Sequence, residues 1–112
     1  MLKYKIYLDE IKESISDLER TDALAVIKKI KDRGIKNTND ILVKNSTLMR
    51  LQVIGESIRK LPRDVIKKYP DVKWAELTLM RHFISHTYSK VPYEQVIDLL
   101  ENEIPKLKEA VK

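Results

Sequence analysis

Residues 46–61, "STLMRLQVIGESIRKL", carry the pattern that decides the fold. Five apolar residues in this stretch recur three or four positions apart: Leu48, Leu51, Ile54, Ile58 and Leu61. This spacing places them on one stripe of an α-helix. Met49 and Val53 add apolar surface on another side of the same helix. We therefore expect a central helix that begins near Ile41 or Ser46 and ends at Pro62.

The segments before this helix follow the same helical period. One apolar stripe predicts a first helix: Tyr4, Leu8, Ile11, Ile15 and Leu18. A second, shorter helix is expected to start after a cap at Thr21 or Asp22 and to stop at Gly34. Residues 36–40, "KNTND", then predict a loop.

The segments after Pro62 predict further helices. A short helix ends before Pro70, another runs from Trp74 through residue 84, and the last begins near Pro92 and should be kinked at Pro105. The chain has only 2 Gly and 4 Pro, and no stretch alternates as a strand would. The sequence therefore predicts an all-α fold, an up-and-down bundle of about five helices in one domain over residues 1–112.

The net charge of +5 is concentrated in one region. Six basic residues against two acidic ones lie in residues 59–73, and five of them form a predicted RNA-binding patch: Arg59, Lys60, Arg63, Lys67 and Lys68. A charge of this size is also typical of proteins that need it only for solubility. The absence of cysteine excludes disulfides and Cys-ligated zinc. Without an apolar run of about 18 residues, we expect no membrane span and a cytoplasmic location.

Residues 81–88, "RHFISHTY", concentrate the groups that can perform chemistry. Both histidines of the chain, His82 and His86, lie here. At 100° per residue, the apolar side chains of this helix share one arc, which we expect to be core: Leu77, Met80, Phe83 and Ile84. The polar groups share the opposite side: Arg81, His82, Ser85, His86 and Tyr88. This face offers a fixed cation, two groups that titrate near neutral pH and two hydroxyls.

Simpler explanations of these residues stay open. The octet can be an ordinary surface helix in which Arg81 pairs with Glu76 or Glu56. His82 and His86 have the i, i+4 spacing of metal ligands, but no cysteine or third ligand lies nearby, so we predict no metal site. A glycine inside a helix, Gly55, is followed by Glu56, which indicates close helix packing or a polar contact there without a catalytic role.

Arginine and histidine together suit RNA cleavage without a metal or other cofactor. Histidine accepts a proton from a ribose 2′-hydroxyl, and arginine stabilises the negative charge at phosphorus as a 2′,3′-cyclic phosphate forms. On one helix, however, Arg81 and His86 point about 140° apart. A homodimer in which two octets meet around a two-fold axis would bring both residues of both chains to one cleft.

Three stretches carry a resemblance to a known family: "LQVIGESIRKLP", "YPDVKWAELTLMRHFISHTY" and "VIDLLENEIPKLKEAV". In order and spacing, residues 45–112, about two thirds of the chain, resemble the HepT-like toxins of the HEPN superfamily. Arg81, His86 and Tyr88 fit their R-x-x-x-x-H-x-Y motif. The resemblance implies an all-α HEPN-like domain, a homodimer with the motif at its interface, and a metal-independent endoribonuclease with Arg81 and His86 as catalytic residues. His82 and Ser85 would support them.

The resemblance also implies a type VII toxin–antitoxin pair. The partner would be a minimal nucleotidyltransferase antitoxin, similar to MntA, that transfers AMP from ATP to the motif tyrosine, here Tyr88. A bulky phosphate group two residues from His86 would fill the cleft and repel RNA. Family members often have Asn after the arginine and Asp between the histidine and tyrosine, where this chain has His82 and Thr87. The first forty residues match only loosely.

Two further hypotheses belong to other classes of protein. The chain can be a non-catalytic HEPN module that binds a nucleotide or a partner, in which case His86→Ala weakens binding only. It can also be a purely structural helical dimer, in which case the octet tolerates alanine. Nothing in the sequence specifies which RNA would be the substrate.

Overall fold

The computed structural model describes residues 3–86 and 90–112, and the side chains of residues 3–81 and 90–112. The described residues form helices and turns without a strand, which confirms the all-α prediction. The elements are α1 (Lys5–Arg20), α2 (Ala23–Arg33), α3 (Thr38–Arg59), α4 (Arg63–Lys67), α5 (Trp74–His86), α6 (Tyr93–Asp98), a π turn (Leu99–Glu103) and α7 (Ile104–Ala110). In this part of the chain, no helix combines the length and the apolar character that a membrane crossing requires.

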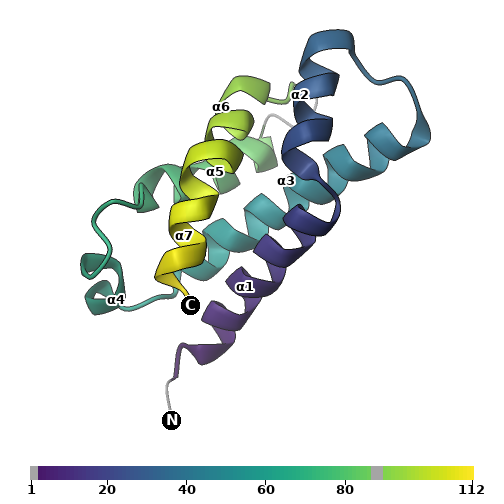
Figure 1. The fold of residues 1–112 in the computed structure, drawn as a ribbon. Coiled ribbons are helices and arrows are strands. Elements are labelled where there is room, and N and C mark those ends of the chain that lie inside the picture. Colours follow the sequence, from purple (N-terminus) through teal and green to yellow (C-terminus); the bar gives the residue numbers. More distant parts are fainter. Residues whose placement is uncertain (1–2, 87–89) are drawn as a thin grey trace.

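Helix α3 is the central element, as its two-sided apolar pattern predicts. It packs against α1, α2 and α5, and Figure 1 shows α1 and α5 lying along it. Two contacts show that α1 runs antiparallel to α3. Near the start of α1, Glu10 Oε2 accepts from Ser57 Oγ at 2.9 Å, and near its end Asp17 Oδ2 lies 2.8 Å from Arg50 Nη2. Helix α5 therefore lies on a scaffold that α1 braces from another side.

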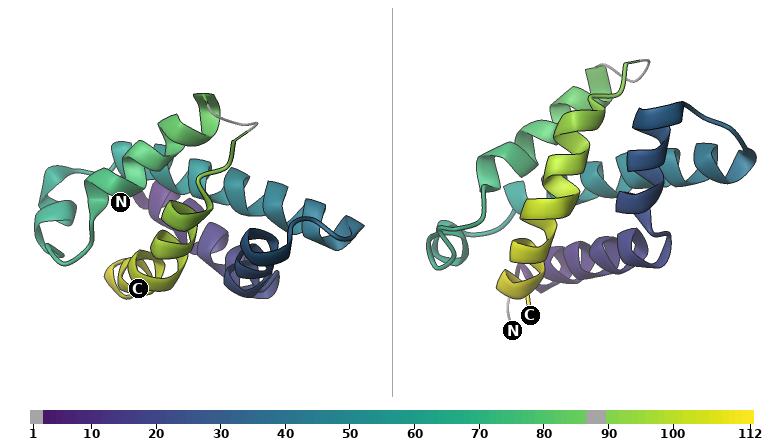
Figure 2. Two further views of the ribbon diagram at one scale, coloured as in Figure 1. Left: turned by 90° about the horizontal axis from the view of Figure 1, so that it is seen from above. Right: turned by 45° about the horizontal axis from the view of Figure 1, so that its top comes forward.

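The core is built from the predicted apolar stripes. In the described part of the chain, residues of six helices and the π turn are buried in it, among them Ile11, Ile15, Ile27, Ile30, Leu48, Leu51, Ile54, Ile58, Leu77, Met80, Val96, Leu100 and Leu107. The last segment, α6 through α7, closes this core against α1 and α2 (Figure 2). Three ion pairs among the described residues join it to α1 and α2: Lys28 Nζ to Glu101 Oε2 at 2.6 Å, Lys31 Nζ to Glu94 Oε1 at 3.4 Å and Lys108 Nζ to Glu19 Oε2 at 2.7 Å.

The predicted loop over residues 36–40 is partly wrong, because α3 begins at Thr38. Asn37 is the N-cap of α3, and its Oδ1 accepts a hydrogen bond from Asp40 N at 2.8 Å. The buried Asp40 carboxylate accepts from Lys36 N and from Arg33 Nη1, each at 2.9 Å. Polar side chains that suggested a loop therefore form a helix start: Asn37 accepts from one of the first N–H groups of the helix, and Asp40 accepts from the Lys36 N–H just before it.

The cap predicted for the second helix lies in the right place but has a different geometry. Asp22 is the N-cap of α2, yet its side chain makes no capping hydrogen bond. Its backbone is left-handed, with φ of 54°, whereas a residue that caps with its side chain usually has an extended backbone. Thr21 instead closes α1, since its Oγ1 donates to Asp17 O at 3.0 Å.

The disturbance predicted at Pro105 takes the form of the π turn directly before α7. Proline has no N–H, so the helix cannot continue its regular hydrogen bonding through this residue. Glu103, in the π turn, is buried, and its Oε1 accepts a hydrogen bond from Lys73 N at 2.9 Å, one residue before α5 begins. The last segment therefore also fixes the start of α5.

Asp40→Asn should change how stability depends on pH. The Arg33 hydrogen bond, aided by the backbone N–H of Lys36, lowers the pKa of Asp40 from its ordinary value of 3.8. Because the folded-state pKa is the lower one, ionised Asp40 stabilises the fold above pH 3.8, and this stabilisation is lost as the pH falls through the folded-state pKa. We expect Asp40→Asn to be less stable than the wild type at pH 7 and to lose less stability below pH 4.

Urea unfolding at intervals from pH 7 to pH 2.5 measures this difference. The exposed carboxylate of the preceding helix offers a matched control, Asp32→Asn, which should follow the wild-type pH profile. Parallel profiles of Asp40→Asn and the wild type would contradict the assigned role of Asp40.

Candidate functional site

Helix α5 carries the motif, and the structure describes its first part in full. Leu77 and Met80 are buried, as the arc predicted, while Arg81 is 30% exposed. The backbone of α5 continues through His86, so five motif positions share one helix with Arg81. The side chains of His82, Phe83, Ile84, Ser85 and His86 lie outside the described residues, as does all of Tyr88. Their convergence with Arg81 stays a prediction.

Arg81 forms an ion pair with Glu56 of α3. Arg81 Nη1 lies 2.6 Å from Glu56 Oε1, a short, charge-assisted hydrogen bond between helices. Arg59 Nη1 approaches the other oxygen of the same carboxylate, Oε2, at 3.8 Å. Of the two acidic partners that the sequence offered, the structure selects Glu56, since Glu76 instead faces Lys73 Nζ at 4.0 Å.

Gly55 explains why the pair is so close. A Cβ atom at this position would lie 3.0 Å from Arg81 Cβ and 3.0 Å from Leu77 O, so a side chain would collide with α5. Glycine thus lets α3 and α5 approach closely, and Glu56, the next residue, comes within reach of Arg81. The sequence indicated close packing or a polar contact at this point, and both are present.

The predicted RNA-binding patch begins beside this ion pair. Arg59 and Lys60 end α3, and Arg63, Lys67 and Lys68 follow on and after α4, all of them exposed. Lys60 Nζ also lies 5.3 Å from the centroid of the Tyr7 ring, a cation–π distance. The patch residues therefore follow one another from the end of α3 to α4, which comes directly after α3 in the chain (Figure 1).

Helix α3 also carries exposed apolar side chains. Leu42 and Met49 are 62% and 52% exposed. A shallow groove of about 410 Å³ is lined by Met49, Val53, Gln52, Glu10 and Glu56. Met49 and Val53, which the sequence placed on a second side of this helix, therefore line an open groove. Glu56, the partner of Arg81, lines the same groove.

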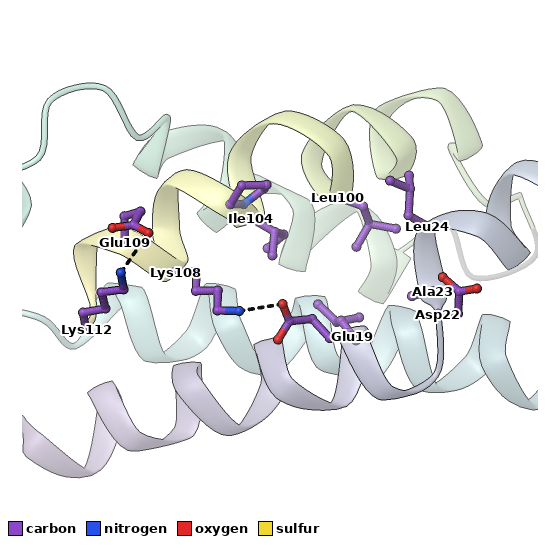
Figure 3. Close-up of a pocket in the computed structure, with 11 residues that line it drawn as sticks. Glu19, Asp22, Ala23, Leu24, Leu100, Ile104, Lys108, Glu109 and Lys112 are labelled. Atoms are coloured by element: carbon purple, nitrogen blue, oxygen red, sulfur yellow. Dashed lines mark hydrogen bonds and ion pairs between the residues drawn. The ribbon is translucent and has the colours of Figure 1, made fainter.

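A separate groove of about 700 Å³ lies between the α1–α2 corner and α7 (Figure 3). Its walls combine Leu18, Leu24 and Leu100 with charged groups, and Lys108 pairs with Glu19 at 2.7 Å along its side. None of the residues that line it belongs to the motif, to Glu56 or to the basic patch. We therefore assign the candidate site to the α3–α5 crossing.

The structure leaves the metal prediction open. Among the side chains described, no three His, Asp or Glu residues are grouped so as to hold an ion. Both histidines lie outside that set, so the absence of a metal site stays a prediction.

Comparison with known families decides the relationship. The family model described as "Ribonuclease HepT-like" matches residues 6–112. The chain belongs to the HepT-like family. This confirms the resemblance drawn from residues 45–112, and the match includes most of the first forty residues, where that resemblance was loose.

Several curated proteins are similar to this HepT-like chain. A Methanocaldococcus jannaschii protein named "Putative RNase" is 37% identical over 70 residues, 62% of this chain and 60% of that protein. A second protein so named in the same organism is 30% identical over 102 residues, 90% of this chain and 78% of that protein. The "Probable ribonuclease HepT" of Thermococcus cleftensis is 29% identical over 63 residues, 56% of this chain and 57% of that protein.

The alignments thus cover less than two thirds of the first and the last of these relatives. No solved structure matches the chain significantly.

Gly55→Val should separate α3 from α5. The added side chain meets the Leu77 carbonyl and Arg81 Cβ, and overpacking of this kind costs about 1–3 kcal/mol of unfolding free energy. The control is Asn45→Val, which places the same β-branched residue on an exposed position of α3. Urea unfolding measures both variants, and equal stabilities would contradict the close crossing.

Proposed function

We propose that this HepT-like chain is a metal-independent endoribonuclease and the toxin of a type VII toxin–antitoxin system. The proposal rests on one observation: in a chain of the HepT-like family, the motif arginine, Arg81, lies partly exposed at a helix crossing. Arg81 is partly exposed at the α3–α5 crossing, and the cationic surface for a phosphate backbone begins beside it at Arg59. The names of the relatives, which describe them as RNases, agree with this activity.

In the proposed reaction, His86 takes the proton from a ribose 2′-hydroxyl, and the 2′-oxygen attacks the adjacent phosphorus. The bond from phosphorus to the 5′-oxygen breaks, and that oxygen leaves with a proton. The products are a 2′,3′-cyclic phosphate and a 5′-hydroxyl end. Arg81 stabilises the additional negative charge on the phosphate in the transition state, with His82 and Ser85 as supporting groups. No step requires a metal or another cofactor.

We propose a homodimer as the active form. Because Arg81 and His86 are five residues apart on α5, one helix turns them about 140° away from each other. Two copies related by a two-fold axis would bring both residues to a shared cleft. The exposed apolar side chains of α3, Leu42 and Met49, support association, since the groove beside Met49 ends at Glu56, the partner of Arg81.

For regulation, we propose a minimal nucleotidyltransferase antitoxin, similar to MntA, that transfers AMP from ATP to Tyr88. In this transfer the tyrosine oxygen bonds to the α-phosphorus, pyrophosphate leaves, and the phenolic proton is released. Tyr88 is two residues from His86 in the sequence, so the added phosphate would introduce negative charge where the RNA backbone must bind. The basis for this part of the proposal is the fit of Tyr88 to the family motif.

Arg81→Ala and His86→Ala should each lower RNA cleavage in EDTA by about 10²-fold or more, because each removes a group that acts on the transition state. The assay uses a mixed RNA pool and identifies the product ends. Arg20→Ala, a change at an exposed arginine of α1, should cleave as the wild type does.

Sedimentation equilibrium at assay concentration should give a dimer.

The outcomes separate the alternatives. Cleavage by both motif variants would contradict the catalytic assignment. If unmodified wild type does not cleave but binds RNA or a nucleotide, and His86→Ala weakens that binding, the chain is a non-catalytic binding module. A strictly monomeric but active protein would contradict the shared cleft.

Tyr88→Phe should block modification and leave cleavage intact, because phenylalanine keeps the ring but has no hydroxyl to accept AMP. The test incubates each protein with ATP and a minimal nucleotidyltransferase encoded beside its gene, then measures intact mass and cleavage. Wild type should gain one or more AMP groups and lose activity, whereas Tyr93→Phe should behave as the wild type. AMP addition to Tyr88→Phe would place the modification elsewhere.

A further inference from the structure

Glu56 lies between an arginine of the motif and an arginine of the basic patch. Its Oε1 is 2.6 Å from Arg81 Nη1, and its Oε2 is 3.8 Å from Arg59 Nη1. One carboxylate thus orients two guanidinium groups, one from α5 and one from the end of α3. The arrangement joins the two sites that the sequence suggested separately, the motif and the patch.

The close packing of the backbones of α3 and α5 constrains the Glu56–Arg81 contact. Gly55 brings α3 against α5 so closely that a Cβ would meet Arg81 Cβ and the Leu77 carbonyl at 3.0 Å. Glu56 is anchored in the same turn as Gly55, next to Ser57, whose hydroxyl is tied to Glu10 of α1 at 2.9 Å. The backbone that carries the Glu56 carboxylate is therefore held in place by packing on both sides, unlike the backbone of a residue on a loosely packed surface.

A fixed carboxylate changes what Arg81 can do. Arginine has a long side chain with many rotamers, and this freedom has to be lost before the guanidinium acts on a phosphate. The Glu56 bond is made by Nη1, one nitrogen of a planar guanidinium, so it restricts how the whole group can turn. The orientation of the cation is thus set before RNA arrives.

The local charge also stays favourable for RNA. Two guanidinium groups surround one carboxylate, so the cluster keeps one positive charge, and the exposed Arg63 and Lys67 continue it on α4. Glu56 therefore does not cancel the attraction of the surface for phosphates. A carboxylate with only one cationic neighbour would cancel that charge.

We propose that Glu56 is a positioning residue of the nuclease: it holds Arg81 in the orientation that stabilises the transition state and sets its distance from Arg59. This inference rests on the proposed function, because it concerns the same site. Glu56 touches neither substrate nor reacting atoms in this account, so its effect passes through Arg81.

The kinetic test uses the 112-residue chain with Glu56→Ala, Glu56→Gln and the control Glu76→Ala. Glu76 is a carboxylate of α5 that faces Lys73 and not Arg81. Glu56→Ala should lower kcat for RNA cleavage by about 10- to 100-fold, the size expected when a catalytic group is misplaced, with an unchanged or lower KM because a negative charge is removed. Glu56→Gln, whose amide oxygen can still accept from Arg81, should recover most of kcat. Glu76→Ala should equal the wild type.

A purely structural role predicts other results. Circular dichroism and thermal unfolding identify variants that have lost the fold, and the comparison of Glu56→Gln with Glu56→Ala keeps the test valid if the alanine variant is less stable. A folded Glu56→Ala enzyme with wild-type kcat, or a loss that appears only as a higher KM, would overturn the proposal.

A second measurement separates this inference from the proposed reaction. The Nε–Hε group of Arg81 can be followed by ¹⁵N NMR relaxation, which reports how ordered the guanidinium is without any RNA. Glu56→Ala should reduce that order, and Glu76→Ala should not. If wild type fails to cleave RNA while Glu56→Ala still loosens Arg81, the reaction is refuted and the positioning contact stands. If wild type cleaves RNA and Arg81 is equally ordered in both proteins, the positioning role is refuted and the reaction stands.

Discussion

The close crossing of α3 and α5 at Gly55 is the constraint on which the rest of the structure depends. With no side chain at this position, the backbone of α3 meets the Leu77 carbonyl and the base of Arg81 directly. The crossing places the motif helix against the longest helix of the bundle, and α1 holds that helix from another side through the Ser57–Glu10 and Arg50–Asp17 contacts. A side chain on a helix surface keeps its place only if the helix itself does not shift, and this packing holds α5 against α3.

The helices could be predicted from the sequence because burial repeats with the period of the helix. The stripes around Ile11, Ile27, Leu51 and Leu107 all enter the core. The start of α3 was missed because Asn37 and Asp40 are residue types shared by loops and helix caps, and only the hydrogen bond between them distinguishes the two. Local sequence patterns do not encode which of these two uses applies.

The candidate site was predictable in its residues and less so in its contacts. A glycine followed by a glutamate inside a helix indicated close packing or a polar contact, yet the partner of Arg81 stayed open between Glu56 and Glu76. The choice depends on how α3 and α5 cross, which brings together residues 25 positions apart in the sequence and which the helical period does not determine. Membership of the HepT-like family adds the chemistry expected of the motif, while the arrangement of His86 and Tyr88 around Arg81 is still a prediction.

The π turn has a consequence for the length of the last segment. The buried residues Val96 and Val111 are fifteen positions apart, whereas four turns of a regular α-helix take about 14.4 residues. The wider turn at Leu99–Glu103 absorbs the difference, so it works as a phase correction that keeps one face toward the core on both sides of Pro105. A one-residue deletion there would leave about 14 positions, close to four regular turns, so the wide turn would become a regular one and both halves would still face the core. Glu103, inside this turn, accepts from Lys73 N, so the wide turn also connects the start of α5 to a segment thirty positions later in the chain.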